Sequence, residues 1–370
     1  MSYKGIYEEA FRLLRICNAC RYCEGICPVW TVIEFRTDFG EEDVDYIANL
    51  CHHCTTCYYV CPYSPPHELN LNPSRTFSII RSISYLKYSP QRFKKIYEKP
   101  IISAIILQVV GVMLALLVAL YNLGFDVDSF FLVSRYYDVF PYNQIYVGGF
   151  VLVVYVIIAF LYQGTRFVKG IGGFSGSFTR SLLLALRDAL FHTWFRDGML
   201  SCGYSGESYR MLKRLFWAPH AMIMYGMLLL VIATIAAAVY KNVLGILSPY
   251  PLYSIPVLLG VTGGVLTFLG VLVVLQDYRG SEVELRVEEE KYLNLALIIT
   301  IALPVITGLL TLTLRTTNLM GLIYTIHMGT VIGFFLYIPF SKLNHAIFRY
   351  LALAKYHSEL LSHELGNKTH

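Results

Sequence analysis

Eight cysteines near the N-terminus form two runs whose spacing could hold iron–sulfur clusters. A proline follows each run directly. The pattern is the bacterial-type ligand run for [4Fe–4S] clusters, in which three cysteines of one run bind a cluster together with the fourth cysteine of the other run. The runs are Cys17-x2-Cys20-x2-Cys23-x3-Cys27 and Cys51-x2-Cys54-x2-Cys57-x3-Cys61. We therefore predict crossed ligation, with Cys17, Cys20, Cys23 and Cys61 on cluster 1 and Cys51, Cys54, Cys57 and Cys27 on cluster 2.

Other uses of eight cysteines fit the spacing less well. Cysteines only three residues apart on a tight turn are poor disulfide partners, and a zinc site uses four ligands in two pairs rather than two runs of four. The residues before each run, Tyr7 to Ile16 and Val44 to Leu50, look helical, and no strand with a period of two flanks them. We predict a helical two-cluster domain over residues 1–95.

The rest of the chain has the composition of a membrane protein. Of its 370 residues, 56% are hydrophobic and 15% are charged, which lies outside the usual range of soluble domains. Six stretches are long and apolar enough to cross a bilayer as helices: about 101–121, 143–163, 218–240, 254–275, 292–314 and 319–341. The predicted fold is therefore all-α, with a helical ferredoxin-type domain followed by a bundle of six transmembrane helices.

Lysine and arginine positions predict how this bundle is oriented. They gather before the first span, between spans two and three and after the sixth, so these segments and both termini are expected in the cytoplasm. No cleavable signal peptide is visible. The expected divisions are spans one and two in 96–163, a connecting segment with a membrane-surface helix in 164–217, spans three to six in 218–350, and a tail in 351–370.

Three histidines at the spans are candidate cofactor ligands, because ionisable residues in a membrane are a functional hypothesis by default. His220 opens the third span and His345 follows the sixth, both at the cytoplasmic boundary, where they could hold one b-type haem. His327 lies eighteen residues before His345, which is five turns and about 27 Å along a helix, so the two are expected to point the same way at opposite depths of the bilayer. At that depth His327 has three open uses: a second haem, a quinone pocket, or a hydrogen-bonded residue inside the bundle.

Other chemistry-bearing residues carry less weight. His52 and His53 lie between two cluster cysteines and could tune a cluster, although exposed loop histidines are the simpler interpretation. Cys202 is expected to be a structural thiol and His192 an interfacial residue. No Gly-rich nucleotide fingerprint lies between a strand and a helix. Without a flavin or nicotinamide site, the clusters must exchange electrons with another protein.

The cysteine segments CNACRYCEGICPVW and LCHHCTTCYYVCPYSPPHELNLN resemble the tricarballylate-utilisation protein B (CitB-type) family. The resemblance continues through CGYSGE, KRLFWAPHAMIMYG and PFSKLNHAIFRY. It implies a membrane protein that takes electrons from a flavin-dependent dehydrogenase and passes them through the clusters and haem to quinone. It also implies that Cys17 to Cys61 hold the clusters and that His220 and His345 hold the haem. The sixth span further resembles the di-haem membrane subunit of respiratory nitrate reductase, but the third span offers only His220.

The predicted function is that of an electron-transfer subunit of a membrane oxidoreductase, with quinone as the acceptor. One alternative is the reverse flow, in which quinol reduces a soluble reductase. A second is a cluster-bearing anchor or redox sensor without haem. A transporter is disfavoured, because the spans show no convincing repeat and no charged residue at mid-span.

Overall fold

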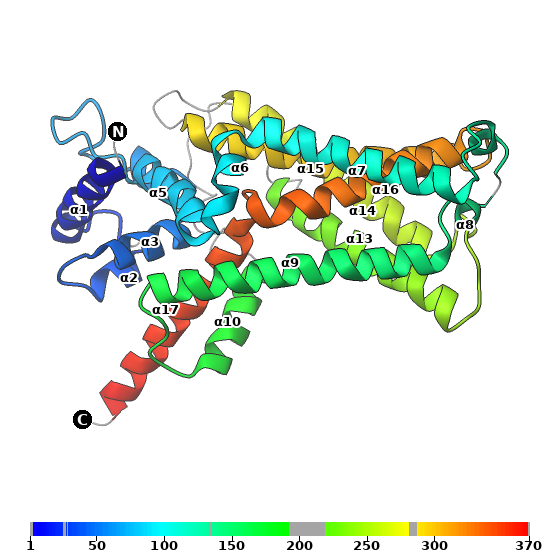
Figure 1. Cartoon of the computed structure of the whole chain (residues 1–370). Coiled ribbons are helices and arrows are strands. Elements are labelled where there is room, and N and C mark those ends of the chain that lie inside the picture. The colour runs from blue at the N-terminus through cyan, green and yellow to red at the C-terminus, as the bar shows by residue number, and fades with distance from the viewer. Residues whose placement is uncertain are drawn as a thin grey trace.

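The computed structural model is all-α in the part of the chain that it describes, which is residues 3–24, 27, 29–133, 135–191, 219–280 and 287–368. A small helical domain lies at one end of a bundle of long helices (Figure 1). The predicted fold class is confirmed.

The N-terminal domain is built from short helices joined by the two cysteine loops. These are α1 (Tyr3–Cys20), α2 (Trp30–Glu34), α3 (Glu41–Leu50), α4 (Thr56–Tyr59), α5 (Pro73–Tyr88), a 3-10 turn (Gln91–Phe93) and α6 (Lys94–Glu98). The inner faces of α1, α3 and α5 bury a shared apolar core that includes Leu13, Ile47 and Ile80. The first run begins in the last turn of α1, and the second begins directly after α3. Burial of these helices thus fixes where the cysteine loops lie.

Six long apolar helices form the bundle: α7 (Pro100–Asn122), α9 (Tyr142–Gly170), α13 (Pro219–Asn242), α14 (Ile255–Gly280), α15 (Glu288–Thr313) and α16 (Met320–Tyr337). A short 3-10 turn (Asp128–Phe131) and α8 (Tyr136–Val139) join α7 to α9 at the end away from the N-terminal domain, which we call the far end. The outer faces of α7 and α9 expose large apolar side chains such as Met113 and Phe150. Such faces suit lipid contact, as expected for membrane spans.

The sixth span, Met320–Phe340, lies within the predicted 319–341, but its α-helix ends before the span does. α16 stops at Tyr337, a 3-10 turn covers Ile338–Phe340, and a separate helix, α17, runs over Asn344–Lys368. Pro339 lies in this turn, and a proline lacks the N–H that a continuing helix needs. The prediction that one continuous helix carries both His327 and His345 is therefore wrong.

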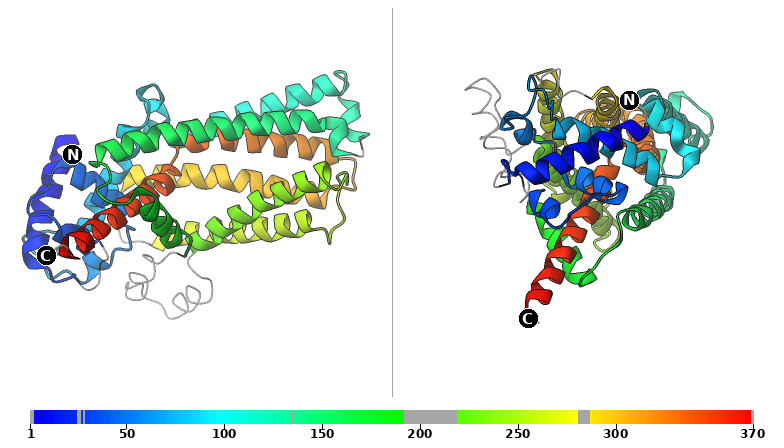
Figure 2. Two further views of the ribbon diagram at one scale, coloured as in Figure 1. Left: turned by 90° about the horizontal axis from the view of Figure 1, so that it is seen from below. Right: turned by 90° about the vertical axis from the view of Figure 1, so that its left-hand side faces the viewer.

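Helix α17 joins the two parts of the molecule. The residues predicted as a tail (351–370) form most of it, and its Ala352 and Phe348 are buried in the core of the N-terminal domain. Figure 2 shows α17 leaving the bundle obliquely and passing beside the N-terminal helices. Arg36 donates to Glu359 of α17 at 2.8 Å. The N-terminal domain is thus tied to the bundle by packing and by a charged pair.

Helix α10 (Phe178–Phe191) occupies the predicted membrane-surface segment and packs against α17. Its Asp188 is buried and lies 2.8 Å from Nε2 of His357. Leu183 and Phe191 are exposed on another part of its surface. This helix therefore packs against α17 with one face and leaves apolar side chains uncovered on another.

Glycines allow α7 and α16 to approach closely. A Cβ added at Gly111 would lie 2.3 Å from the carbonyl oxygen of Gly329 and 2.5 Å from the backbone nitrogen of Gly333. Such contacts between backbones cannot relax by a side-chain movement. Small residues of this kind are a common basis of helix packing in membranes.

We expect Gly111→Ala to destabilise the bundle by about 1–3 kcal/mol, the usual cost of overpacking. Gly148→Ala is the matched control, because nothing lies within 4 Å of a Cβ added there. Thermal unfolding in detergent should show a lower midpoint for the first variant alone. Equal midpoints for both variants would contradict the close packing of α7 on α16.

Candidate redox cofactor sites

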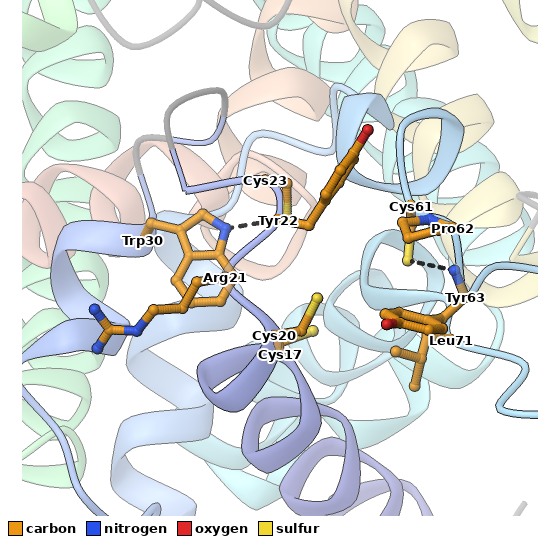
Figure 3. Close-up of a pocket in the computed structure, with 10 residues that line it drawn as sticks. All are labelled: Cys17, Cys20, Arg21, Tyr22, Cys23, Trp30, Cys61, Pro62, Tyr63 and Leu71. Carbon is orange, nitrogen blue, oxygen red and sulfur yellow. Dashed lines mark hydrogen bonds between the residues drawn. The ribbon is translucent and has the colours of Figure 1, made fainter.

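The cluster 1 cysteines line one hollow in the N-terminal domain. Figure 3 shows this hollow, with Cys17, Cys20 and Cys23 facing Cys61 across it. Three ligands from the first run thus meet the fourth cysteine of the second run, which is the arrangement that crossed ligation requires.

The cluster 2 cysteines gather separately and deeper. Burial is the main cause that raises the pKa of Cys57 well above its ordinary value, and the neighbouring Cys27, Cys51 and Cys54 add to it. Burial likewise raises the pKa of Cys27, and Cys51 makes the next largest contribution. Cys27, which belongs to the first run in sequence, therefore lies with the three leading cysteines of the second run.

The surroundings of these thiols suit a metal cluster. Burial, helped by neighbouring thiols, raises the pKa of Cys17 to about 12, so a metal-free site would hold crowded neutral thiols. Thiolates bound to iron would instead accept hydrogen bonds. Among the described residues, N–H groups that donate to cysteine sulfur atoms include Trp30 Nε1 to Cys23 at 3.1 Å, Tyr63 N to Cys61 at 3.4 Å and His53 N to Cys51 at 3.4 Å. The residues present thus fit two thiolate-ligated clusters.

His220 and His345 lie together at the bundle end nearest the N-terminal domain. Their ring centroids are 5.9 Å apart, and the ring planes make an angle of 73°. Two imidazoles that share one metal through bonds of about 2.0 Å would have centroids about 6 Å apart. The separation therefore suits an iron held between the two rings.

Hydrogen bonding fixes which nitrogen of His345 can face a metal. Its Nδ1 lies 2.6 Å from the carbonyl oxygen of Lys342, to which it can only donate. Nε2 then carries the lone pair, which is the usual arrangement of a metal-binding histidine. Burial and the neighbouring His220 lower the pKa of His345 well below its ordinary value, so its ring is neutral, the form that binds haem iron.

The structure keeps His327 apart from this pair. Its ring is enclosed between α15 and α16, with Nδ1 3.1 Å from the hydroxyl oxygen of Thr307 and with Gly308 beside it. Thr307 also lies 3.0 Å from the hydroxyl oxygen of Thr330. These contacts favour the hydrogen-bonded interpretation of His327 among the three that the sequence left open.

A buried charged network that sequence reasoning missed lies between the cluster 2 loop and the bundle. Glu290, at the start of α15, accepts from Arg81 at 3.2 Å and from Lys342 at 2.6 Å, and the hydroxyl of Ser78 also contacts it. His53 faces Glu290, with its Nδ1 at 3.5 Å. His53 is thus held against the bundle, and the interpretation of it as an exposed loop residue is wrong.

Two arginines of this region converge on one backbone atom of the cluster 2 loop. Arg81 donates to the carbonyl oxygen of Cys51 at 2.7 Å, and Arg349 donates to the same oxygen at 2.6 Å. Arg349 also donates to the carbonyl oxygen of Asn49 at 3.3 Å. Because Arg349 lies one helical turn after His345 on α17, it bridges the cluster 2 loop and the histidine pair.

Two residues singled out from the sequence, Cys202 and His192, lie outside the described residues.

The fold and these sites define a membrane protein with a ferredoxin-like domain of eight cysteines, which is consistent with electron transfer. The family model described as citrate utilization protein B matches residues 98–364, and that of its Fer4-like domain matches residues 10–87. A protein of Escherichia coli named citrate utilization protein B is 30% identical over 354 residues, which cover 94% of this chain and 91% of that protein. No solved structure matches. The chain belongs to the citrate utilization protein B family, and the predicted resemblance is confirmed.

Proposed function

We propose that this protein is the membrane-bound electron-transfer subunit of an oxidoreductase. In this proposal a partner flavin-dependent dehydrogenase delivers electrons to the two clusters, and a b-type haem passes them to quinone. Each of these groups supplies one-electron chemistry when bound. The observation that carries the proposal is the pair His220 and His345, 5.9 Å apart and linked through Arg349 to the loop of Cys51.

The chain's own residues have distinct parts in this proposal. Cysteine thiolates hold the clusters, and N–H donors such as Trp30 stabilise the negative charge on sulfur. The carbonyl of Lys342 accepts from Nδ1 of His345, so Nε2 is the nitrogen that would bind an iron shared with His220. Helix α17 and the buried charged network connect the loop of Cys51 to the helix that carries His345.

Orientation in the membrane follows from charge. Lysines and arginines crowd the bundle end that carries the N-terminal domain and α17, whereas the far end holds few, among them Lys241 and Arg315. By the positive-inside rule, we place the N-terminal domain and the C-terminus in the cytoplasm. The partner dehydrogenase would then be a cytoplasmic protein. The name of the Escherichia coli relative refers to citrate, so a small carboxylic acid is the substrate class that we propose for the partner.

The test is a spectroscopic reduction and reoxidation of the purified chain. A b-type spectrum should appear on reduction with dithionite, and addition of a water-soluble quinone should reoxidise it within the mixing time. Cluster signals without any b-type spectrum would overturn the proposal in favour of a cluster-bearing anchor. A b-type spectrum that quinone leaves reduced would remove quinone as the acceptor.

A further inference from the structure

The two predicted clusters lie in different electrostatic surroundings. Cluster 1 is the outer one, because Cys20 is exposed and Tyr22 beside it is 65% exposed. Two arginines lie near this site, and each has a carboxylate neighbour: Arg12 pairs with Glu9 at 2.7 Å, and Arg21, which lines the hollow, lies 3.9 Å from Glu34 and 4.0 Å from Glu24. Little uncompensated charge therefore acts on this site.

Cluster 2 faces a buried excess of positive charge. Among the described residues, the network at its loop contains three cations, Arg81, Arg349 and Lys342, against one anion, Glu290. His53 lies beside this network, with its Nδ1 3.5 Å from Glu290. Arg81 and Glu290 have only 5% and 8% of their side chains exposed.

Buried cations without a matching anion are costly. An oxidised [4Fe–4S] cluster and its four thiolate ligands together carry about two negative charges. These charges would balance the excess of two positive charges in the network. Reduction of the cluster adds one more negative charge. Positive charge in a region of low dielectric constant stabilises that reduced form and raises the reduction potential.

We propose that Arg81 and Arg349 are positioning residues that give cluster 2 the higher reduction potential of the pair. Cluster 1 then meets the partner protein at the exposed Cys20, and cluster 2 passes electrons toward His345. One electron moves from reduced cluster 1 to oxidised cluster 2, and no bond or proton changes place. This inference rests on the proposed function, because it states the order in which the two clusters pass electrons in that function.

The test is a redox titration of the full chain in detergent, followed by electron paramagnetic resonance, with iron and sulfide content measured for every variant. Trp30→Phe removes the N–H···S bond to Cys23 and should lower the potential of the cluster 1 signal alone. Arg349→Gln removes a buried charge at Cys51 and should lower the potential of the other signal alone. In the wild type, the signal that responds to Arg349→Gln should have the higher potential.

Further variants keep the test decisive. Arg349→Lys retains the charge, so its shift should be smaller than that of Arg349→Gln. If the glutamine variant does not fold, Arg81→Gln removes the other charge at the Cys51 carbonyl and should lower the potential of the same signal. Arg75→Gln, on the exposed face of α5, should shift neither signal. The inference would be overturned if Trp30→Phe and Arg349→Gln shifted the potential of the same signal. It would also be overturned if, in the wild type, the signal that Trp30→Phe shifts had the higher potential. Reoxidation of haem by quinone in the wild type is measured separately, so a failure of the proposed function would be recognised independently.

Discussion

Replacing His345 with alanine should abolish the b-type haem spectrum and leave the iron–sulfur content unchanged. The ring of His345 is one of two imidazoles at a separation that suits a shared iron, and its Nδ1 bond to Lys342 orients the other nitrogen. An alanine would leave His220 alone, and one imidazole cannot provide both axial ligands. Pyridine haemochrome, with total iron and acid-labile sulfide, measures both outcomes on one sample.

His363→Ala is the matched control for this experiment. It removes another histidine of the same helix, whose ring stacks on Phe35 at a centroid distance of 4.3 Å. That contact lies in the N-terminal domain, so haem content should be unaffected. Full haem in the His345 variant would refute the pairing of His220 with His345, and loss of haem in both variants would point to a general loss of structure.

Local spacing explains why the cysteine sites could be predicted from sequence. Cysteines three residues apart lie close together in any fold. In the two-run pattern, the fourth cysteine of each run binds the cluster that the other run holds. The structure groups Cys27 with Cys57 and Cys61 with Cys17, as the sequence predicted, although bound clusters stay a prediction. Hydropathy likewise located six spans, because each is longer than the bilayer needs.

The break between α16 and α17 shows where hydropathy was insufficient. Pro339 lies in an apolar stretch, so a hydrophobic window continues through it, although the helix does not. The distance along one helix from His327 to His345 therefore had no structural meaning. His345 nevertheless lies near His220, because both residues lie in the first turn of their helices at the same end of the bundle.

The buried charged network could not be predicted, because its partners are far apart in sequence. Arg81 and Glu290 are separated by 209 residues, and Arg349 and Cys51 by 298. No local period marks such residues as neighbours. The one available signal was Glu290 at the start of an apolar span, because a buried carboxylate needs a partner.

Replacing single cysteines should divide the eight residues into two sets according to which cluster signal is lost. Cys61→Ser should remove the same paramagnetic signal as Cys17→Ser, and Cys27→Ser the same signal as Cys54→Ser. Each variant should lose about four of about eight non-haem irons. Haem content should be intact, because the proposed haem ligands, His220 and His345, include no cysteine.

This experiment separates crossed from uncrossed ligation, which loss of iron alone cannot do. If each run held its own cluster, Cys27→Ser would remove the signal that Cys17→Ser removes, and the grouping seen in the hollow of Figure 3 would not reflect ligation. Cys202→Ser is the control, because it removes a cysteine that belongs to neither run. Its iron content should equal that of the wild type. Crossed ligation also predicts that both clusters depend on correct packing of α1 against α3 and α5, since each cluster draws ligands from both loops.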